Sequence, residues 1–295
     1  MSLFCFRCTS FNNNSILSGL TRQDTSSYTG HFCYGNLLQH TSQYRSYFSQ
    51  MSWENTYKEL VGGGTYVKTP KRAIANYCYG STITACKWPI YIKGGKHYIL
   101  PRPYPKSKPG STGFQIMMRD WFREFVRDVE KSAIFFLKEL HPNTGESKKI
   151  LKLMLETRKF VPYELRIAGS CFTHMSLIGK LDPKGEIPPH FDEKDVITAL
   201  VHLGSGVTGG STLYYSGLTT ENKGEIKKGI DFRHGQIQVG CYNTTLHGVE
   251  RWSGKRGCIN FNLKESILNH FKDEGMHYFK QYRRNKYPSS NFYST

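Results

Sequence analysis

The sequence predicts a mainly β fold with flanking helices, an α+β protein whose core is a double-sheet barrel of the jelly-roll kind. Residues 161–265 consist of short apolar runs separated by glycine turns, with no helical periodicity between them, which is typical of such barrels. A long amphipathic segment precedes these runs and predicts helices that pack against the barrel. Because the sequence has no run of 18 apolar residues, it predicts no membrane span and no membrane partner.

Five segments of the predicted barrel have the character of strands. They are short, apolar or alternating, and bounded by glycine or polar turns. The predicted strands are 171–179, 196–203, 211–215, 235–240 and 257–263. A glycine turn at Gly209 and Gly210 precedes the third strand, and a turn over residues 253–256 opens the last one.

Two helices are predicted before the barrel and one after it. The first covers about 114–140, because apolar side chains recur there at steps of three and four residues. These side chains are Met117, Trp121, Phe125, Val129, Ala133 and Phe136. A second helix is predicted at 148–157 and a short one at 266–271. We interpret the apolar stripe of the first helix as core and not as a partner site.

We expect four regions along the chain. Residues 1–50 are rich in Ser, Thr, Asn and Tyr and poor in acids, which fits an organellar transit segment and equally a disordered tail. Met51 is an alternative start within the sequence. Residues 51–160 form a basic support region with the two long helices. The barrel core covers 161–265, and 266–295 form a C-terminal helix and a basic tail.

Positive charge is concentrated in the support region. The formal net charge is +17, and residues 51–160 contain 20 basic and 9 acidic residues, against 12 and 11 in residues 161–265. The basic residues between 68 and 108 are interleaved with aromatic ones, a composition that can bind phosphates and stack on bases. Two interpretations stay open. Residues 68–108 either contact a nucleic acid or form a solvated basic surface whose aromatic residues pack on the barrel.

The eight cysteines of the chain do not predict a disulfide framework. Cys5 and Cys8 form a lone CxxC without a second pair at zinc-finger spacing. Cys171, Cys241 and Cys258 lie in or beside predicted strands, where a free cysteine is commonly a small buried hydrophobe. We therefore expect a reducing intracellular compartment, either cytoplasm or nucleus. An organelle is the alternative if residues 1–50 are a transit segment.

Four residues carry the chemistry that the sequence predicts: His190, Asp192, His247 and Arg256. Residues two apart on a strand point to the same face, so His190 and Asp192 can hold one metal ion together, with His247 as the third ligand. Two imidazoles and one carboxylate are the ligand set of non-haem iron(II) oxygenases and leave adjacent coordination positions open. Arg256 lies nine residues after His247, and a planar guanidinium can bind a carboxylate through two parallel bonds.

From about residue 173 to 263, a third of the chain, the sequence resembles the catalytic core of the Fe(II)/2-oxoglutarate-dependent dioxygenases. It is most similar to the prolyl-4-hydroxylase-like branch. That branch has, in order, an HxD, a strand, a GGxT-aromatic turn, a strand before a His-Gly-Val, and a Gly-x-Arg or Gly-x-Lys. The corresponding residues here are 190–192, 209–214, 247–249 and 254–256.

The resemblance implies a double-stranded β-helix in which His190, Asp192 and His247 bind Fe(II) and Arg256 binds the distal carboxylate of 2-oxoglutarate. It implies an enzyme that hydroxylates a C–H bond with O2, with ascorbate as a supporting reductant. The favoured substrate is a peptidyl side chain such as proline. A nucleobase in DNA or RNA and a small metabolite are the alternatives. The loop 219–231 and the support region are the segments expected to determine specificity.

The sequence does not identify the other residues of the 2-oxoglutarate pocket. Many relatives carry a tyrosine on the strand before the HxD, and the predicted strand 171–179 has none. Thr173, Ser176 and Tyr214 are the candidates to replace it, and the sequence does not choose among them.

Two further histidines are possible metal ligands, and a non-catalytic function is the alternative to an enzyme. His174 and His202 also lie in predicted strands, and we interpret both as structural because a lone strand histidine usually is. A non-catalytic metal-binding barrel, acting as a sensor or binding module, is the rival to an enzyme. Cupin-like proteins share this architecture, and a fold does not determine function.

Overall fold

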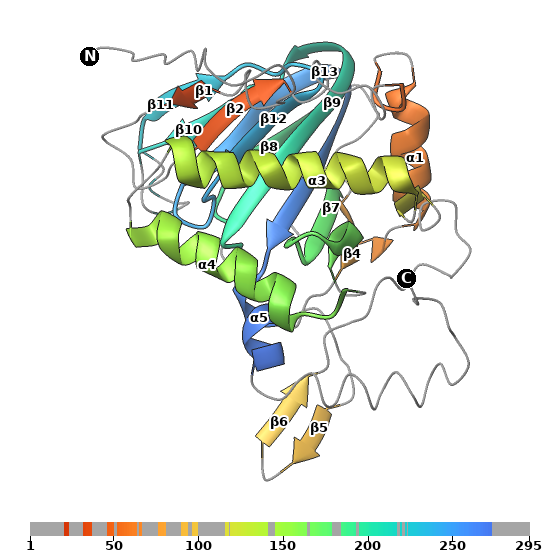
Figure 1. Ribbon diagram of the computed structural model, residues 1–295. Helices are drawn as coiled ribbons and strands as arrows, with labels where there is room; N and C mark the ends of the chain where they lie inside the picture. Colours follow the sequence, from red (N-terminus) through yellow and green to blue (C-terminus); the bar gives the residue numbers. More distant parts are fainter. Residues whose placement is uncertain are drawn as a thin grey trace.

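A curled antiparallel sheet flanked by helices forms the described part of the protein (Figure 1). The computed structural model describes residues 21–23, 32–36, 46–49, 52–63, 65–66, 76–80, 90–93, 96–99, 116–117, 119–140, 145–163, 166–178, 184–192, 195–216, 219, 222 and 224–272, with the backbone alone for 21–36 and 65–99. The α+β class and the double-stranded β-helix architecture are those that the sequence predicts.

Eleven described strands belong to one sheet, and its two long central strands are β9 (Ile197–Gly209) and β13 (His247–Leu263). These two run antiparallel, from Leu263 opposite Ile197 to Trp252 opposite Gly209. The other strands of the sheet are β1 (Thr21–Gln23), β2 (Phe32–Asn36), β3 (Thr65–Tyr66), β4 (Asn76–Gly80), β7 (His174–Ile178), β8 (Lys184–His190), β10 (Thr212–Tyr215), β11 (Ile226–Ile230) and β12 (Gln236–Gly240). A separate pair consists of β5 (Ile90–Lys93) and β6 (Lys96–Ile99).

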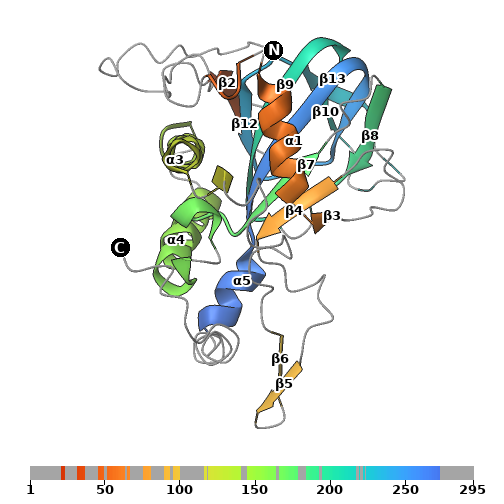
Figure 2. The same ribbon diagram turned by 90° about the vertical axis from the view of Figure 1, so that its right-hand side faces the viewer.

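Strand β13 joins the two sides of the curl. Its N-terminal half pairs with β8 and β10, whereas its C-terminal half pairs with β7. Strand β8 therefore lies on the side of the molecule away from helices α3 and α4 (Figure 2). The predicted turn over 253–256 is instead a bulge inside β13, with Gly254 at φ +88°. A Cβ on Gly254 would lie 2.1 Å from the carbonyl oxygen of Gly206, so this bulge requires glycine.

Helices form at the three predicted places with different lengths, and α1 (Trp53–Gly63) is a helix that the sequence did not predict. The other helices are α3 (Asp120–Phe135), the π-helical η2 (Phe136–Leu140), α4 (Gly145–Phe160), the 3-10 turn η4 (Ile167–Gly169) and α5 (Glu265–His270). The helix predicted over 114–140 is thus α3 continued by η2. The helix predicted at 148–157 is α4, which extends by three residues at each end, from Gly145 to Phe160.

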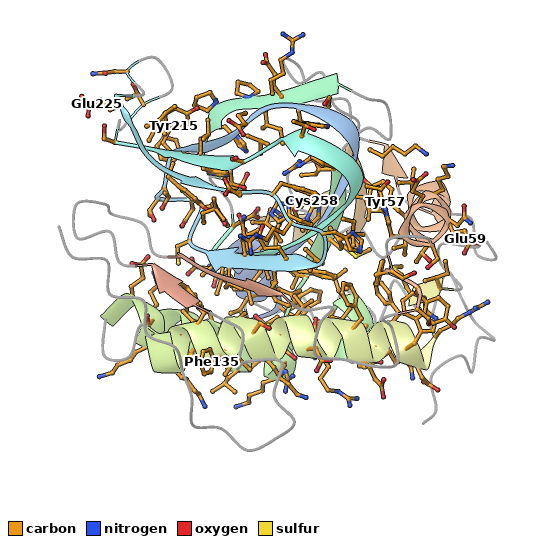
Figure 3. The ribbon with its side chains drawn as sticks, turned by 90° about the horizontal axis from the view of Figure 1, so that it is seen from above. Tyr57, Glu59, Phe135, Tyr215, Glu225 and Cys258 are labelled. Atoms are coloured by element: carbon orange, nitrogen blue, oxygen red, sulfur yellow. The ribbon has the colours of Figure 1, made fainter. Side chains whose placement is uncertain are left out.

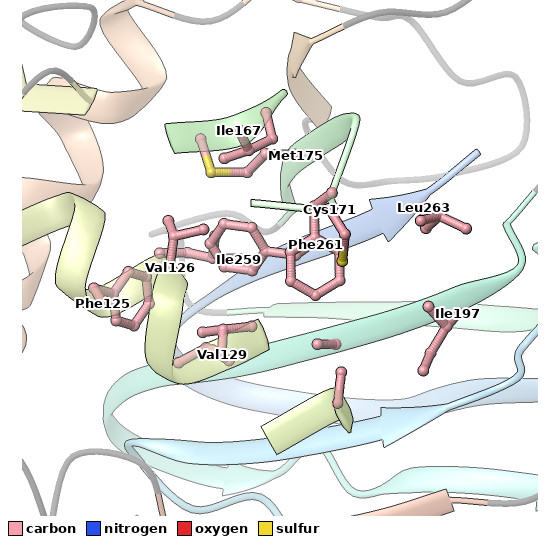
Figure 4. Packing of buried hydrophobic residues seen from close by; sticks show 14 of the residues in the cluster. Phe125, Val126, Val129, Ile167, Cys171, Met175, Ile197, Ile259, Phe261 and Leu263 are labelled. Carbon is pink, nitrogen blue, oxygen red and sulfur yellow. The ribbon is translucent and has the colours of Figure 1, made fainter. Parts of the chain in front are cut away.

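The apolar stripe of α3 is core, as predicted. Figure 4 shows Phe125, Val126 and Val129 of this helix facing Ile259 and Phe261 of β13. The rings of Phe125 and Phe261 are 5.8 Å apart, and both side chains are fully buried. Burial of one such side chain contributes about 1.5–3 kcal/mol to the free energy of folding. This contact holds α3 against the face of the sheet opposite the interior of the curl.

Residues 1–50 are expected to be a transit segment or a disordered tail, and two described parts of them contact the rest of the fold. Strand β2 pairs with β12, and Phe48 is fully buried with its ring 4.8 Å from that of Phe125. Backbone pairing and one buried ring hold these parts against the barrel. Neither contact produces a periodic pattern in the sequence. The side chains of residues 68–108, which carry the nucleic-acid hypothesis, lie outside the described residues. Within the described chain, no helix has the length and apolarity to cross a membrane.

Candidate metal centre

His190, Asp192 and His247 lie together at one end of the curl. His190 is the last residue of β8 and His247 the first of β13, and the two are register partners. Asp192 follows β8 instead of lying on it, and its backbone N–H donates to the carbonyl of Tyr242 at 3.0 Å. The candidate ligand atoms of the three residues lie within 4.8 Å of one another. The HxD is therefore assembled by a strand end and a loop, and not by alternation along a strand.

The hydrogen bonds of the two imidazoles prepare them as metal ligands. Nδ1 of His190 is 2.8 Å from the carbonyl oxygen of Pro188, and Nδ1 of His247 is 2.9 Å from that of Thr245. A carbonyl only accepts, so each Nδ1 carries the proton and each Nε2 has a lone pair. These Nε2 atoms lie 3.6 and 3.8 Å from the carboxylate oxygens of Asp192. The donor set fits a divalent metal ion such as Fe(II).

A cavity opens at the three residues and extends into the curl. Its walls come from strands β7, β8, β9, β10 and β13 and from the turn after β12. The lining residues are Ile178, Ile187, His190, Asp192, Leu200, His202, Thr212, Tyr242, His247, Val249, Arg256, Cys258 and Asn260. Seen from above, Cys258 lies inside the curled sheet (Figure 3). Only Asp192 and Arg256 among the lining residues carry a permanent charge.

Arg256 is a buried cation without an acidic partner among the described residues. The side chain is 1% exposed, and its Nε and Nη1 have no hydrogen-bond partner. Its guanidinium lies 4.9 Å from the ring of Trp252 and 5.2 Å from that of Phe232. Burial lowers the pKa of Arg256 from its usual value. An unpaired buried cation is costly, so this end of the cavity fits a ligand carboxylate.

Gly210 makes room for this arginine. Its φ is +79°, a conformation that side chains rarely adopt. A Cβ there would lie 3.2 Å from Cβ of Trp252 and 3.4 Å from Nε of Arg256. The second glycine of the GGxT turn therefore has a physical role beside the guanidinium.

Lys255 and Arg256 point to opposite faces of β13, as alternation along a strand predicts. Lys255 is exposed and its Nζ is 3.0 Å from a carboxylate oxygen of Glu54 on α1. The neighbouring lysine is therefore not part of the cavity.

None of the three candidates for the missing tyrosine lines the cavity. Thr173 accepts the backbone N–H of Lys264, and Ser176 lies in β7 opposite Asn260. Tyr214 is fully buried, with its hydroxyl 3.1 Å from that of Tyr242.

Tyr242 lines the cavity instead, and its ring centroid is 4.5 Å from that of His247. Sequence reasoning missed it because nothing local distinguishes Tyr242 from the other tyrosines.

Cys258 and Asn260 could have been found from the sequence. They follow Arg256 at steps of two on one strand, so all three share a face, and all three line the cavity. The thiol of Cys258 donates to Oδ1 of Asn260 at 2.9 Å, and burial raises its pKa to about 12. This cysteine is therefore a neutral hydrogen-bond donor.

The two strand histidines have different surroundings. His174 is buried outside the cavity, with Nδ1 3.5 Å from Nδ2 of Asn262, and burial holds its pKa well below the usual range. His202 lines the cavity, and its Nδ1 is 3.3 Å from Nη2 of Arg256. The structural interpretation suits His174. His202 differs, because it lines the cavity and contacts Arg256.

No protein-family model matches the sequence, and no curated protein sequence matches it. Solved structures do match, among them an oxidoreductase of the 2OG-Fe(II) oxygenase family from Burkholderia pseudomallei, at 11% identity and a TM-score of 0.34. That match covers 73% of this chain and 80% of the other.

Two of the matches are prolyl hydroxylases. The Trichoplax adhaerens prolyl hydroxylase, in complex with a hypoxia inducible factor peptide fragment, is 10% identical with a TM-score of 0.40, over 81% of this chain and 86% of that one. The Pseudomonas putida prolyl-4-hydroxylase is 9% identical with a TM-score of 0.30, over 68% and 77%. At such values, function has to be argued from this chain's own residues.

Proposed function

We propose that this protein is an Fe(II)/2-oxoglutarate-dependent dioxygenase that hydroxylates a C–H bond. One observation carries the proposal: a two-histidine, one-carboxylate cluster and a buried unpaired arginine line the same cavity. A purely structural cluster would not need the arginine. A carboxylate-binding site alone would not need the two imidazoles with their Nε2 lone pairs turned to one carboxylate.

The residues have separate parts in this proposal. His190, Asp192 and His247 hold Fe(II) through Nε2, one carboxylate oxygen and Nε2, which leaves coordination positions open. Arg256 binds the distal carboxylate of 2-oxoglutarate, because its Nε and Nη1 have no other partner in the described chain. The bound iron would supply the activation of O2 that is coupled to conversion of 2-oxoglutarate to succinate and CO2, with ascorbate keeping the iron reduced.

Wild-type protein incubated with Fe(II), ascorbate and 2-oxoglutarate tests the activity. We expect slow formation of succinate even without the main substrate, and none with Asp192→Ala. A protein that binds the metal but forms no succinate under any of these conditions would instead be a non-catalytic metal-binding module.

The proposed substrate is an uncharged peptidyl side chain such as proline. Asp192 and Arg256 are the charged lining residues, and both are occupied once metal and 2-oxoglutarate bind. The wall formed by Ile178, Ile187 and Val249 is apolar. Such a wall suits an aliphatic C–H bond better than a charged group. The motif resemblance of residues 190–256 favours the same class.

A nucleobase is the second candidate, favoured by the excess of basic residues in 51–160. Binding to DNA or RNA through 68–108 has to weaken steeply with added salt, because it releases counterions. Parallel incubations with proline-containing peptides and with oligonucleotides, analysed for a mass gain of one oxygen atom, separate the two substrates. A flat salt dependence of oligonucleotide binding between low and physiological ionic strength would remove the nucleic-acid candidate.

A further inference from the structure

Three buried polar side chains lie on the two strands that follow that of Arg256 across the sheet. Gln236 and Gln238 lie on β12, His202 on the adjacent β9, and Arg256 on β13 next to β9. The four side chains are 3%, 0%, 2% and 1% exposed. Polar groups are rarely buried in such a row unless they bind one another or a ligand.

The hydrogen-bonding directions in this row follow from chemistry. A guanidinium can only donate, so at 3.3 Å from Nη2 of Arg256 the Nδ1 of His202 has to be the acceptor. A neutral imidazole that accepts at Nδ1 carries its proton on Nε2. Burial, with the charge of Arg256 as a second cause, lowers the pKa of His202 to about 3. His202 is therefore neutral at physiological pH and keeps the acceptor lone pair.

Gln238 lies on the strand next to that of His202 and is fully buried. Its Nε2 donates to Oε1 of Gln236 at 3.2 Å, which turns its own Oε1 away from that bond. The Gln238 side chain raises the pKa of His202 slightly against the larger effect of burial. No regular hydrogen bond is formed, since His202 Nε2 and Gln238 Oε1 both lack a partner within bonding geometry. The Nε2–H of His202 is thus a buried donor, and Oε1 of Gln238 is a buried acceptor, without a hydrogen-bond partner among the described residues.

We propose that His202 is a positioning residue for 2-oxoglutarate: its Nδ1 accepts a hydrogen bond from Nη2 of Arg256 and fixes the guanidinium so that Nε and Nη1 meet the distal carboxylate. This rests on the proposed function. The rings of Trp252 and Phe232 lie within cation–π distance of the guanidinium, and this attraction does not fix its rotation in the plane. His202 provides the directional contact. The pair thereby selects a keto acid with a second carboxylate over one without it.

Binding of keto acids to the Mn(II)-loaded protein tests this without turnover. The two ligands are 2-oxoglutarate and pyruvate, which shares the metal-chelating end and lacks the distal carboxylate. For His202→Leu we expect about 10-fold or greater loss of 2-oxoglutarate affinity, the usual effect of losing a hydrogen bond to a charged group. Pyruvate affinity should be unchanged. His174→Leu, which removes the buried strand histidine outside the cavity, is the matched control and should change neither.

Two amide variants separate positioning from packing. Asn at 202 places an acceptor oxygen near the position of Nδ1, whereas Gln places its polar atoms near Nε2. His202→Asn should therefore retain most of the affinity for 2-oxoglutarate and His202→Gln should not. In an Arg256→Ala background, His202→Leu should cause no further loss, because a positioning residue acts only through its partner.

Three results would overturn the inference: equal losses for both keto acids, unchanged 2-oxoglutarate affinity in His202→Leu, or rescue by Gln instead of Asn. Should His202→Leu not fold, the comparison of the two amide variants decides by itself. Arg256→Ala with wild-type affinity for 2-oxoglutarate would refute the proposed co-substrate site itself. Loss of affinity in Arg256→Ala with none in the His202 variants would refute the positioning role alone.

Discussion

Replacement of Arg256 by alanine tests the co-substrate pocket most directly. The guanidinium is 1% exposed, and no other described lining residue is a permanent cation. A carboxylate bound there would lose its charged partner in a buried site. Truncation of one partner of a buried charge pair costs roughly 2–5 kcal/mol, which corresponds to about 30-fold to several-thousand-fold in affinity.

A thermal-shift assay with the Mn(II)-loaded protein measures this loss. With 2-oxoglutarate at 100 times its wild-type dissociation constant, the ligand stabilises the wild-type protein by about 2.7 kcal/mol. For a chain of this size that is a rise in Tm of about 5–10 °C. Arg256→Ala with 100-fold weaker binding would gain only about 0.4 kcal/mol, or roughly 1 °C. Metal content should stay that of the wild type, because the ligands are untouched.

Lys255→Ala is the matched control. It removes the neighbouring cation on the opposite face, whose exposed ion pair with Glu54 is worth at most about 1 kcal/mol. The rise in Tm on adding 2-oxoglutarate should be that of the wild type. If Lys255→Ala loses the rise and Arg256→Ala keeps it, the assignment of the anchor is wrong. Loss of metal from Arg256→Ala would also refute the division of roles.

Three further predictions concern the metal, acid stability and the core. Asp192→Ala should lose metal and turnover together, because it removes the anionic ligand; metal analysis after gel filtration checks this, and retained iron would contradict it. Since burial lowers the pKa of His202 to about 3, below the value of about 6.5 in the unfolded chain, its contribution to stability is present above about pH 6.5 and falls as pH drops toward 3. Compared with His202→Asn, the free energy of unfolding of the wild type should fall by about 1.4 kcal/mol more per pH unit between pH 6 and 4 in urea titrations; parallel curves would count against it. Glu130→Gln should lower the free energy of unfolding by about 2–3 kcal/mol, because this buried carboxylate binds Arg158 and the backbone N–H of Cys171; an unchanged urea midpoint would refute that role.

The sequence by itself determined the class of fold and the order of the chemical groups. Strand patterns between 171 and 263 and the stripe of the first helix are local periodicities, and both kinds of element form where they are predicted. The spacing of His190, Asp192 and His247 and the glycine turns are likewise readable from neighbours along the chain. The alternation that separates Lys255 from Arg256 needs only the direction of one strand.

Only the tertiary structure decided how these groups meet. His190 and His247 are far apart in the sequence and become neighbours because β8 pairs with the start of β13. Tyr242 and His202 enter the cavity through the curl of the sheet, which no local pattern contains. Cross-strand register is a property of long-range pairing, and a shift of one residue would turn every side chain to the other face. For the same reason, that Arg256 is buried without an acid among the described residues could be known only once its surroundings were assembled.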